Sequence, residues 1–544
     1  MRSLERAADS VADLVVVGGG ITGAGIARDA ALRGYRVVLL DRGDFASGTS
    51  SRSSKLIHGG VRYLQQGDLG LVKEAARERS VLRRIAPHLA TPARMLVPAA
   101  SKGARLKLGA GMWTFEKLAG PEAEERHESF DRAGTLGIEP RLRSERLSGA
   151  VSFTEYITND ARLTLENLQS AARAGADIIN YAIARKAELD GSGVKIEIED
   201  LERGERAVIR ARCAVNAAGP WFEHVRDSGV GATDQVGAPR VQLTRGIHLV
   251  VPRERFPISS IVVMRAPDGR SAFVVPSGPY AYIGTTDTNY EGDPSEPGIT
   301  TEDVDYLLAA ASATFEDAPG SEDIIGTWSG VRPLLRQDGK KPSEISRRDE
   351  IHVGPGPFVS IVGGKLTTYR RMAERVVDKV RDILGDQPAE ADTAGQALTG
   401  GSEGDQQSAR QRSPRLDDSE LETRLWVTYG AVAEQLVARI AQKPELGEPL
   451  EGLDALCRAE IEHCVDHEMV LTLDDLLRRR SHVAMFDTPS SMAGASAAAQ
   501  ILAGRLGWDA DRVRGEVEAF TRARTAELSA ARHESEHPTG TESK

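Results

Sequence analysis

Cysteine and aromatic residues are scarce in this chain, and long apolar runs are missing. Its 544 residues include 3 Cys, and Phe, Trp and Tyr together make up 5%. Cys213, Cys457 and Cys464 have no Cys-x-x-Cys spacing, so the sequence contains no common iron–sulfur, zinc or dithiol motif. No apolar stretch approaches the roughly 20 residues of a membrane-spanning helix. We therefore expect a globular protein whose chemistry does not depend on cysteine.

Positive charge is also in deficit. There are 69 Lys and Arg against 80 Asp and Glu, for a formal net charge of -11 at pH 7. This balance disfavours nucleic acid as a partner. The N-terminus lacks the apolar core of a signal peptide, so we expect a cytoplasmic protein. The length predicts two or three domains with a substantial core.

The most informative motif is a glycine-rich turn near the N-terminus. An apolar run ends at Gly18, and a helical pattern extends from Thr22 to Arg33. Gly18 permits a tight turn, Gly20 lets the backbone approach a pyrophosphate, and Gly23 lets the helix lie close to the sheet. The free N–H groups and the helix dipole favour phosphate at this helix start. The segment predicts a Rossmann-like dinucleotide site.

A carboxylate follows at the expected distance. Asp41 ends the next apolar run, 21 residues after Gly20. At this spacing a carboxylate accepts hydrogen bonds from ribose hydroxyls, and it would repel a 2′-phosphate. The motif alone does not separate FAD from NAD.

Alternating apolar runs indicate an antiparallel sheet inserted into the nucleotide-binding domain. We place its strands at 241–251, 258–265, 271–276 and 280–285, and a half-buried helix at 69–85. The nucleotide-binding pieces are about 12–90, 150–225 and 325–384, with the substrate sheet at about 240–320.

The C-terminal third has a different composition. Residues 385–419 are polar and poor in aromatics, which predicts a linker. Helical patterns over 421–441, 455–480, 490–506 and 509–530 predict a separate α-helical domain at 420–530, and 531–544 is a polar tail that we expect to be disordered. The fold class is therefore α/β plus α.

A second glycine pair suggests a flavin. Gly363 and Gly364 end a strand and Lys365 precedes a helix. The first N–H groups of that helix would stabilise the negative charge of a reduced flavin near N1, which a nicotinamide does not need. A simple strand-to-helix turn is the equally weighted alternative.

Several basic side chains follow apparent strand ends. Arg332, Arg347 and Lys365 could hold a phosphate dianion through charge-assisted hydrogen bonds. His58 and His248 lie in Gly-containing stretches, where an imidazole could take a proton from an alcohol. Each residue taken singly is more often structural. His463 and His467 do not form His-Glu-x-x-His, so we expect no metal.

These segments occur in the order found in one family. The motifs at 18–23, 49–64, 160–163, 216–221, 283–287, 329–334 and 363–369 resemble flavin-dependent glycerol-3-phosphate dehydrogenases. Residues 465–468 and 474–479 resemble that family's helical C-terminal domain. The resemblance is strong over 13–384 and moderate over 420–530.

The resemblance implies FAD, oxidation of sn-glycerol 3-phosphate to dihydroxyacetone phosphate, and electron transfer to a membrane quinone. It implies that Arg332, Arg347 and Lys365 bind phosphate or polarise the C2 oxygen, with His58 and His248 near the substrate. Because Arg348 lies beside Arg347, either of the two could be the phosphate-binding arginine. The sequence does not identify the residue that accepts the hydroxyl proton. A quinone acceptor implies peripheral attachment to the inner face of the cell membrane.

Together the glycine motifs and the resemblance predict a set of cofactor contacts. Thr49 to Ser51 would lie along FAD, and Gly363 to Thr367 would cover the isoalloxazine. The full set is Gly18, Gly20, Ile21, Thr22, Gly23, Asp41, Arg42, Thr49, Ser50, Ser51, Gly219, Gly363, Gly364, Lys365, Leu366 and Thr367.

One segment suits a membrane interface. Residues 102–118 mix cations with Trp113 and Phe115, although a core-packed helix would show the same residues.

Cys457 and Cys464 do not fit the extra cysteines expected of an anaerobic subunit, which favours the single-subunit respiratory type.

Other functions stay open at this point. They are a glycerol-3-phosphate oxidase that uses oxygen, an amine or amino-acid oxidase on the same scaffold, and a regulatory protein with structural FAD. A homodimer is also left open.

Overall fold

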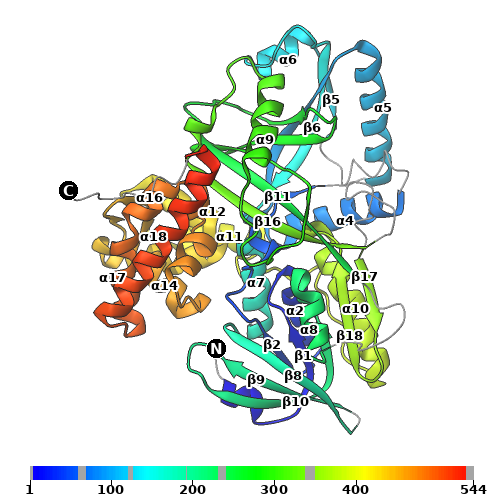
Figure 1. The fold of residues 1–544 in the computed structure, drawn as a ribbon, viewed down its shortest axis with the longest axis vertical. Coiled ribbons are helices and arrows are strands. Elements are labelled where there is room, and N and C mark those ends of the chain that lie inside the picture. The colour runs from blue at the N-terminus through cyan, green and yellow to red at the C-terminus, as the bar shows by residue number, and fades with distance from the viewer. Residues whose placement is uncertain are drawn as a thin grey trace, which may run out of the picture.

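Two sheets and a helical domain make up the molecule (Figure 1). The computed structural model describes residues 4–58, 69–119, 126–191, 193–230, 240–336 and 349–534. The first sheet lies at one end with the N-terminus, the second sheet at the other end, and the C-terminal helices lie to one side of both. Within these ranges, no helix is both long enough and apolar enough to cross a membrane.

The first sheet is the expected nucleotide-binding sheet. In spatial order its strands are β17 (Asp349–Val353), β18 (Phe358–Gly363), β10 (Arg206–Asn216), β1 (Ala12–Val17), β2 (Val37–Leu40) and β7 (Asp177–Ile179), with β9 (Gly193–Asp200) and β8 (Ala182–Asp190) continuing from β10. The strands from β18 to β7 are parallel to their neighbours on this path.

Both faces of this sheet are buried, which explains the unbroken apolar run of β1. Leu14 and Val16 pack under three helices, and Val15 and Val17 pack against the β8–β9 hairpin. The helices are α2 (Ile21–Leu32), α7 (Asp160–Arg173) and α10 (Tyr369–Leu384). The short helices α1 (Leu4–Ala8) and α8 (Phe222–Asp227) lie near β10.

The second sheet carries the expected antiparallel strands. Its order is β15 (Thr288–Tyr290), β11 (Val241–Pro252), β14 (Tyr280–Gly284), β13 (Ser271–Ser277), β12 (Ile261–Arg265), β4 (Thr91–Ala99), β6 (Gly149–Ile157) and β3 (Leu56–Ile57), with β16 (Gly326–Leu335) on β11 and β5 (Glu128–Asp131) on β6. Helix α9 (Thr301–Thr314) covers one face, and α4 (Leu69–Ile85) and α5 (Lys102–Ala119) cover the other. Helix α6 (Arg132–Ile138) follows β5.

The sequence-based division between the sheets is wrong at three strands. β3, β6 and β16 lie in pieces assigned to the nucleotide-binding domain, yet all three pair within the second sheet. The chain therefore crosses between the sheets more often than its pattern predicts, and residues from both sheets come together at the crossings.

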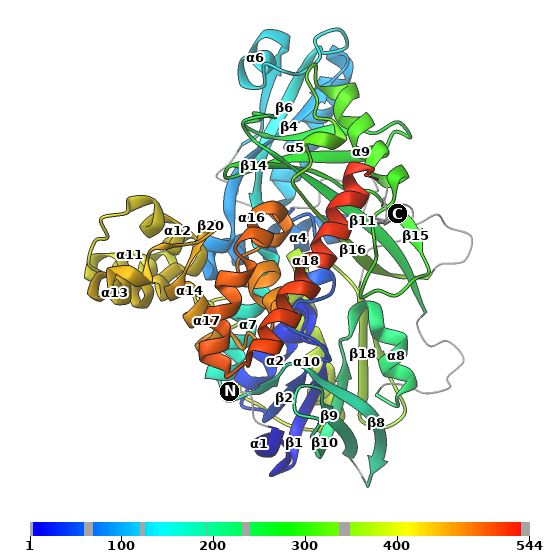
Figure 2. The ribbon, with the colours of Figure 1, turned by 60° about the vertical axis from the view of Figure 1, so that its left-hand side comes forward.

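The C-terminal helices form a separate group beside the sheets (Figure 2, yellow to red). They are α11 (Glu403–Arg412), α12 (Ser419–Tyr429), α13 (Ala433–Gln442), α14 (Arg458–Glu468), a π-helix (Asp475–Arg480), α15 (Val483–Phe486), α16 (Thr488–Ala493), α17 (Ala495–Leu506) and α18 (Ala510–Arg532), with the hairpin β19 (Pro449–Leu450) and β20 (Leu453–Cys457). The end of α18 packs into the core of the second sheet through Leu528 and Ala531.

The predicted linker at 385–419 is not a free connection. It contains α11, and Leu398 is buried. The buried Arg28 donates to the carbonyl oxygens of Thr393 at 3.2 Å and Gln396 at 2.7 Å. Because these contacts use the main chain, composition does not reveal them. The tail beyond residue 534 lies outside the described residues.

Candidate active site

Both sheets contribute to a cavity of about 1970 Å³. Its wall includes the end of β1, the loops after β2 and β18, and side chains from β4, β6, β12 and β16. This exceeds the roughly 300–1000 Å³ of ordinary small-molecule sites. The cavity can therefore hold an extended dinucleotide together with a small substrate.

The glycine turn has the geometry that the sequence predicts. Gly18 has φ +117°. A Cβ at Gly23 would lie 1.8 Å from the carbonyl oxygen of Gly18, so α2 approaches the turn as only glycine allows. Ser50 Oγ accepts from the N–H of Ile21 at 2.9 Å. Gly18, Gly20, Ile21 and Thr22 line the cavity, which places the start of α2 against it.

Asp41 lies at the end of β2, in the same wall. Its carboxylate accepts from the N–H of Gly19 at 2.7 Å and of Gly43 at 2.9 Å. Burial raises the pKa of Asp41 to about 6, against the lowering effect of these two N–H groups. Arg42 lines the cavity beside it and lies over the ring of Trp221. The glycine turn, this carboxylate and the cavity volume fit FAD.

The second glycine pair closes the other side of the cavity. Gly363 and Gly364 have φ +79° and +84°, after β18 and before the 3₁₀ turn Leu366–Thr368 that leads into α10. A Cβ at Gly364 would lie 2.3 Å from Met372 Cε. Lys365 lies between the glycine pair and the 3₁₀ turn and lines the cavity.

Most predicted cofactor residues line the cavity, and three do not. Thr49, Ser50, Gly219 and the segment 363–366 are in its wall. In the described part of the chain, Gly23, Ser51 and Thr367 lie behind it, and the last two are buried. Thr367 Oγ1 donates to the carbonyl of His58 at 3.3 Å, so it supports the wall instead.

Arg332 projects from β16 into the cavity wall. Its Nη2 donates to Thr285 Oγ1 at 2.9 Å, and its Nη1 lies 3.3 Å from Asp287 Oδ1. His58 and Lys365 line the same cavity. Three predicted catalytic residues are thus brought together, whereas Arg347 lies outside the described residues.

His248 does not line the cavity in the described structure. It is buried, stacks on Trp328 with ring centroids 4.6 Å apart, and its Nε2 lies 2.9 Å from Ser54 Oγ. Burial, with smaller effects of Arg332 and Lys55, lowers its pKa well below 6.5. His248 is therefore neutral and supports the segment that leads to His58, while its predicted place near the substrate stays a prediction.

Further residues in the wall were not among the predicted site residues, although most of them lie in the motifs named above. They are Arg52, Tyr181, Trp221, Thr285, Asp287, Asp474 and Arg479. The last two belong to the helical C-terminal domain. The motif at 474–479 is the one noted above for its resemblance to a helical C-terminal domain. No local feature of that motif predicts that it lines a nucleotide cavity.

No group of three or more metal-ligating side chains occurs in the ranges that the structure describes. His463 is buried, and its ring lies 4.8 Å from that of His467. A dinucleotide turn and convergent basic side chains in one cavity define the class as a dinucleotide-dependent oxidoreductase.

Known proteins support this class and refine it. The family model for FAD dependent oxidoreductases matches residues 13–370, and that for the C-terminal domain of alpha-glycerophosphate oxidase matches residues 391–513. The aerobic glycerol-3-phosphate dehydrogenase of Staphylococcus aureus (strain USA300) is 37% identical over 97% of this chain and 96% of its own. The enzyme of that name from Staphylococcus haemolyticus is 39% identical over 87% of each chain.

Solved structures agree. The glycerol-3-phosphate dehydrogenase from Bacillus halodurans complexed with FAD has a TM-score of 0.79 and 32% identity, with 98% of this chain and 97% of that chain covered. The L-alpha-glycerophosphate oxidase from Mycoplasma pneumoniae, at TM-score 0.55 and 16% identity over 71% of this chain and 98% of its own, shows the fold alone. The chain belongs to the FAD-dependent oxidoreductases and, within them, to the glycerol-3-phosphate dehydrogenase family.

Proposed function

We propose that this protein oxidises sn-glycerol 3-phosphate to dihydroxyacetone phosphate and passes the electrons to a membrane quinone. The observation that carries the proposal is the meeting of Arg332 and Lys365 with the dinucleotide turn in one cavity. The names of its relatives supply the substrate. Bound FAD supplies the hydride acceptor.

The side chains have separate tasks in this proposal. Arg332 binds the substrate phosphate through paired N–H donors, and Thr285 and Asp287 hold its guanidinium in place. Lys365 polarises the C2 oxygen. His58 takes the hydroxyl proton, because it lines the cavity whereas His248 lies behind the wall. Arg347 adds a second cation at the phosphate.

Anaerobic mixing tests the reaction directly. Glycerol 3-phosphate is expected to bleach the visible flavin absorption, and a soluble quinone analogue to restore it. D- and L-amino acids, offered separately, should leave the spectrum unchanged. Bleaching by an amino acid would move the protein to the amine oxidases. Rapid recovery with oxygen and none with quinone would identify an oxidase.

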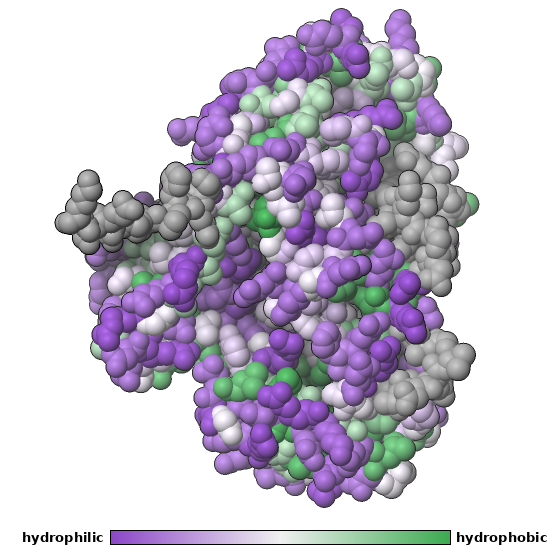
Figure 3. Space-filling model, in the orientation of Figure 1, coloured by the Kyte–Doolittle hydropathy of each residue, from purple (hydrophilic) through white to green (hydrophobic). Residues whose placement is uncertain are grey.

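The proposed membrane contact lies on α5. Leu106 and Trp113 are 73% and 57% exposed, and Lys107 and Lys117 are on the same helix. Phe115 is 4% exposed and packs in the core, so its predicted contact with lipid is wrong. The face shown in Figure 3 is mostly hydrophilic with small separate apolar patches.

Replacing both Leu106 and Trp113 by Ser should release the protein from anionic vesicles. Losing two inserted apolar side chains costs about 3 kcal/mol or more, roughly a hundredfold in partitioning. Flotation with phosphatidylglycerol vesicles measures the bound fraction. Val427→Ser, at a 56% exposed apolar side chain on α12, is the matched control. Equal flotation of both variants and wild type would exclude α5 as the contact.

A further inference from the structure

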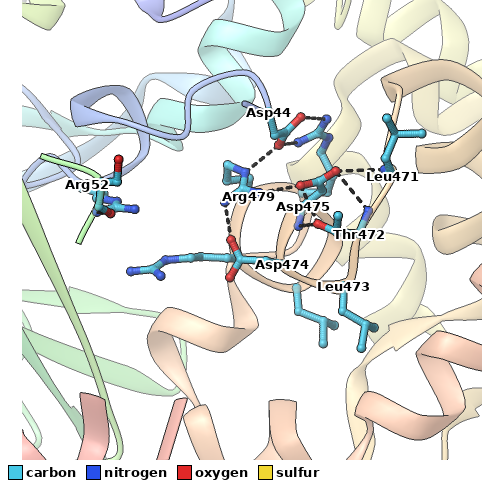
Figure 4. Close-up of polar contacts among 12 residues, drawn as sticks. Asp44, Arg52, Leu471, Thr472, Leu473, Asp474, Asp475 and Arg479 are labelled. Atoms are coloured by element: carbon cyan, nitrogen blue, oxygen red, sulfur yellow. Dashed lines mark hydrogen bonds and ion pairs between the residues drawn. The ribbon is translucent and has the colours of Figure 1, made fainter. Parts of the chain in front are cut away.

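One segment of the C-terminal domain reaches the dinucleotide cavity. Asp474 and Arg479 stand in the same cavity wall as Asp41 and Arg42. Arg479 belongs to the π-helix Asp475–Arg480, and Asp474 is the residue directly before that helix. Figure 4 shows Arg479 between Asp44, which follows β2, and Asp474. The helical domain is therefore in contact with the loop that holds the predicted ribose carboxylate.

Arg479 makes three charge-assisted hydrogen bonds. Its Nε donates to Asp44 at 2.5 Å, its Nη1 to Asp474 at 2.5 Å and its Nη2 to Asp475 at 2.6 Å (Figure 4). The side chains of Arg479 and Asp44 are 5% and 0% exposed. Removing one partner of such a buried ion pair strongly lowers stability, because the remaining charge has no water to solvate it.

Asp44 is held by two cations of the C-terminal domain. Arg480 adds hydrogen bonds to both oxygens of Asp44, at 2.5 and 2.9 Å. Burial alone would raise the pKa of Asp44, but Arg480 and Arg479 lower it below its ordinary value. Asp44 is thus an ionised anchor three residues after Asp41.

A second connection holds the other side of the same loop. Tyr181 donates its hydroxyl to Asp475 at 2.6 Å. The N–H of Tyr181 donates to the carbonyl of Gly43 at 2.9 Å, and the N–H of Ala182 to that of Asp41 at 2.7 Å. These contacts connect the C-terminal domain to the segment that carries Asp41.

We propose that Arg479 is a positioning residue for FAD, and that docking of the C-terminal domain and FAD binding stabilise each other. The proposal rests on the FAD dependence of the family and is independent of the substrate. An ordinary interdomain contact would stabilise the fold without changing cofactor affinity. Arg479 lies in the cavity wall and holds the Asp44 loop, which connects docking of the domain to the cofactor site. Since a coupling between two binding equilibria is reciprocal, each event should strengthen the other.

Titration of flavin-free full-length protein with FAD tests the first direction. Arg479→Gln is expected to raise the FAD dissociation constant roughly 10- to 100-fold, and Arg479→Lys to recover part of the loss. Arg505→Gln is the matched control, since Arg505 pairs with Asp466 on the surface of the same domain. A dissociation constant equal to that of wild type in folded Arg479→Gln would overturn the proposal.

Two further measurements keep the test decisive if that variant does not fold. Tyr181→Phe removes one hydroxyl and should raise the dissociation constant roughly 2- to 10-fold. Hydrogen exchange of the wild-type protein tests the reverse direction: FAD should slow exchange in residues 471–482 and leave α17 unchanged. Equal exchange of 471–482 with and without FAD would show that the domain docks independently of the cofactor.

Discussion

Replacing Arg332 by Ala is expected to lower kcat/KM for glycerol 3-phosphate roughly a hundredfold, while the protein keeps its full FAD content. The Arg332 guanidinium would donate charge-assisted hydrogen bonds to the substrate phosphate dianion. Losing these bonds weakens substrate binding by about 3 kcal/mol. Steady-state kinetics with a quinone analogue, together with the flavin-to-protein absorbance ratio, measures both quantities.

The control separates substrate binding from folding. Arg253 also lies on the second sheet, directly after β11, but it is outside the cavity wall and donates to the carbonyl of Ile258. Arg253→Ala should leave kcat/KM unchanged. Arg332→Lys should retain part of the activity, because it keeps the charge and loses the paired donors. Parallel loss of flavin and activity in Arg332→Ala would assign Arg332 to the fold and not to the substrate.

Gly23→Ala should yield a protein that is purified largely without flavin. The new Cβ would lie 1.8 Å from the Gly18 carbonyl oxygen, so α2 or the glycine turn must move before the chain can fold. Such overpacking costs about 1–3 kcal/mol or more. The displaced turn would no longer offer its N–H groups at the phosphate position. Flavin content and the unfolding midpoint of the flavin-free protein report the two effects separately.

A second glycine in a helix provides the comparison. Gly504 lies in α17, and a Cβ there meets nothing within 4 Å. Gly504→Ala should keep its flavin and gain about 1 kcal/mol of stability, because alanine is the better helix former. Normal flavin content in Gly23→Ala would mean that the turn is not the phosphate site.

Local patterns predicted several elements with nearly their observed bounds. The run at 241–251 is found as β11 (Val241–Pro252), and the helical pattern at 69–85 is found as α4 (Leu69–Ile85). On α4 a half-buried surface imposes the helical period on the sequence. In β11 the residues from Gly246 to Val251 are all buried, and its many β-branched and apolar residues, followed by turn residues, predicted the strand. The glycine turn was predictable for a similar reason, since its backbone geometry restricts which residues fit.

Several strands of the second sheet, including β6 and β4, were missed or misplaced. β6 is buried on both faces, and β4 contains Pro92 and Pro98, so neither shows clear alternation. On α5 the sequence could not distinguish the exposed Trp113 from the buried Phe115 two residues later.

Long-range contacts at the site were beyond local inference. Asp44 and Arg479 are 435 residues apart, and only the folded chain brings them together. His248 is the opposite case. Its Gly-containing segment suggested a place in the cavity wall, but in the described structure its ring stacks on Trp328 and lies beside Ser54 behind that wall.

The span of the cavity wall, from Val17 to Arg479, also bears on biosynthesis. A ribosome makes the glycine turn first and the π-helix among the last elements, so a growing chain holds one half of the pocket long before the other. If docking and FAD binding are coupled as proposed, tight cofactor capture is expected late, after the helical domain leaves the exit tunnel and docks. Chains truncated before residue 479 would carry the dinucleotide motif without a complete wall, so flavin retention would distinguish finished molecules from fragments.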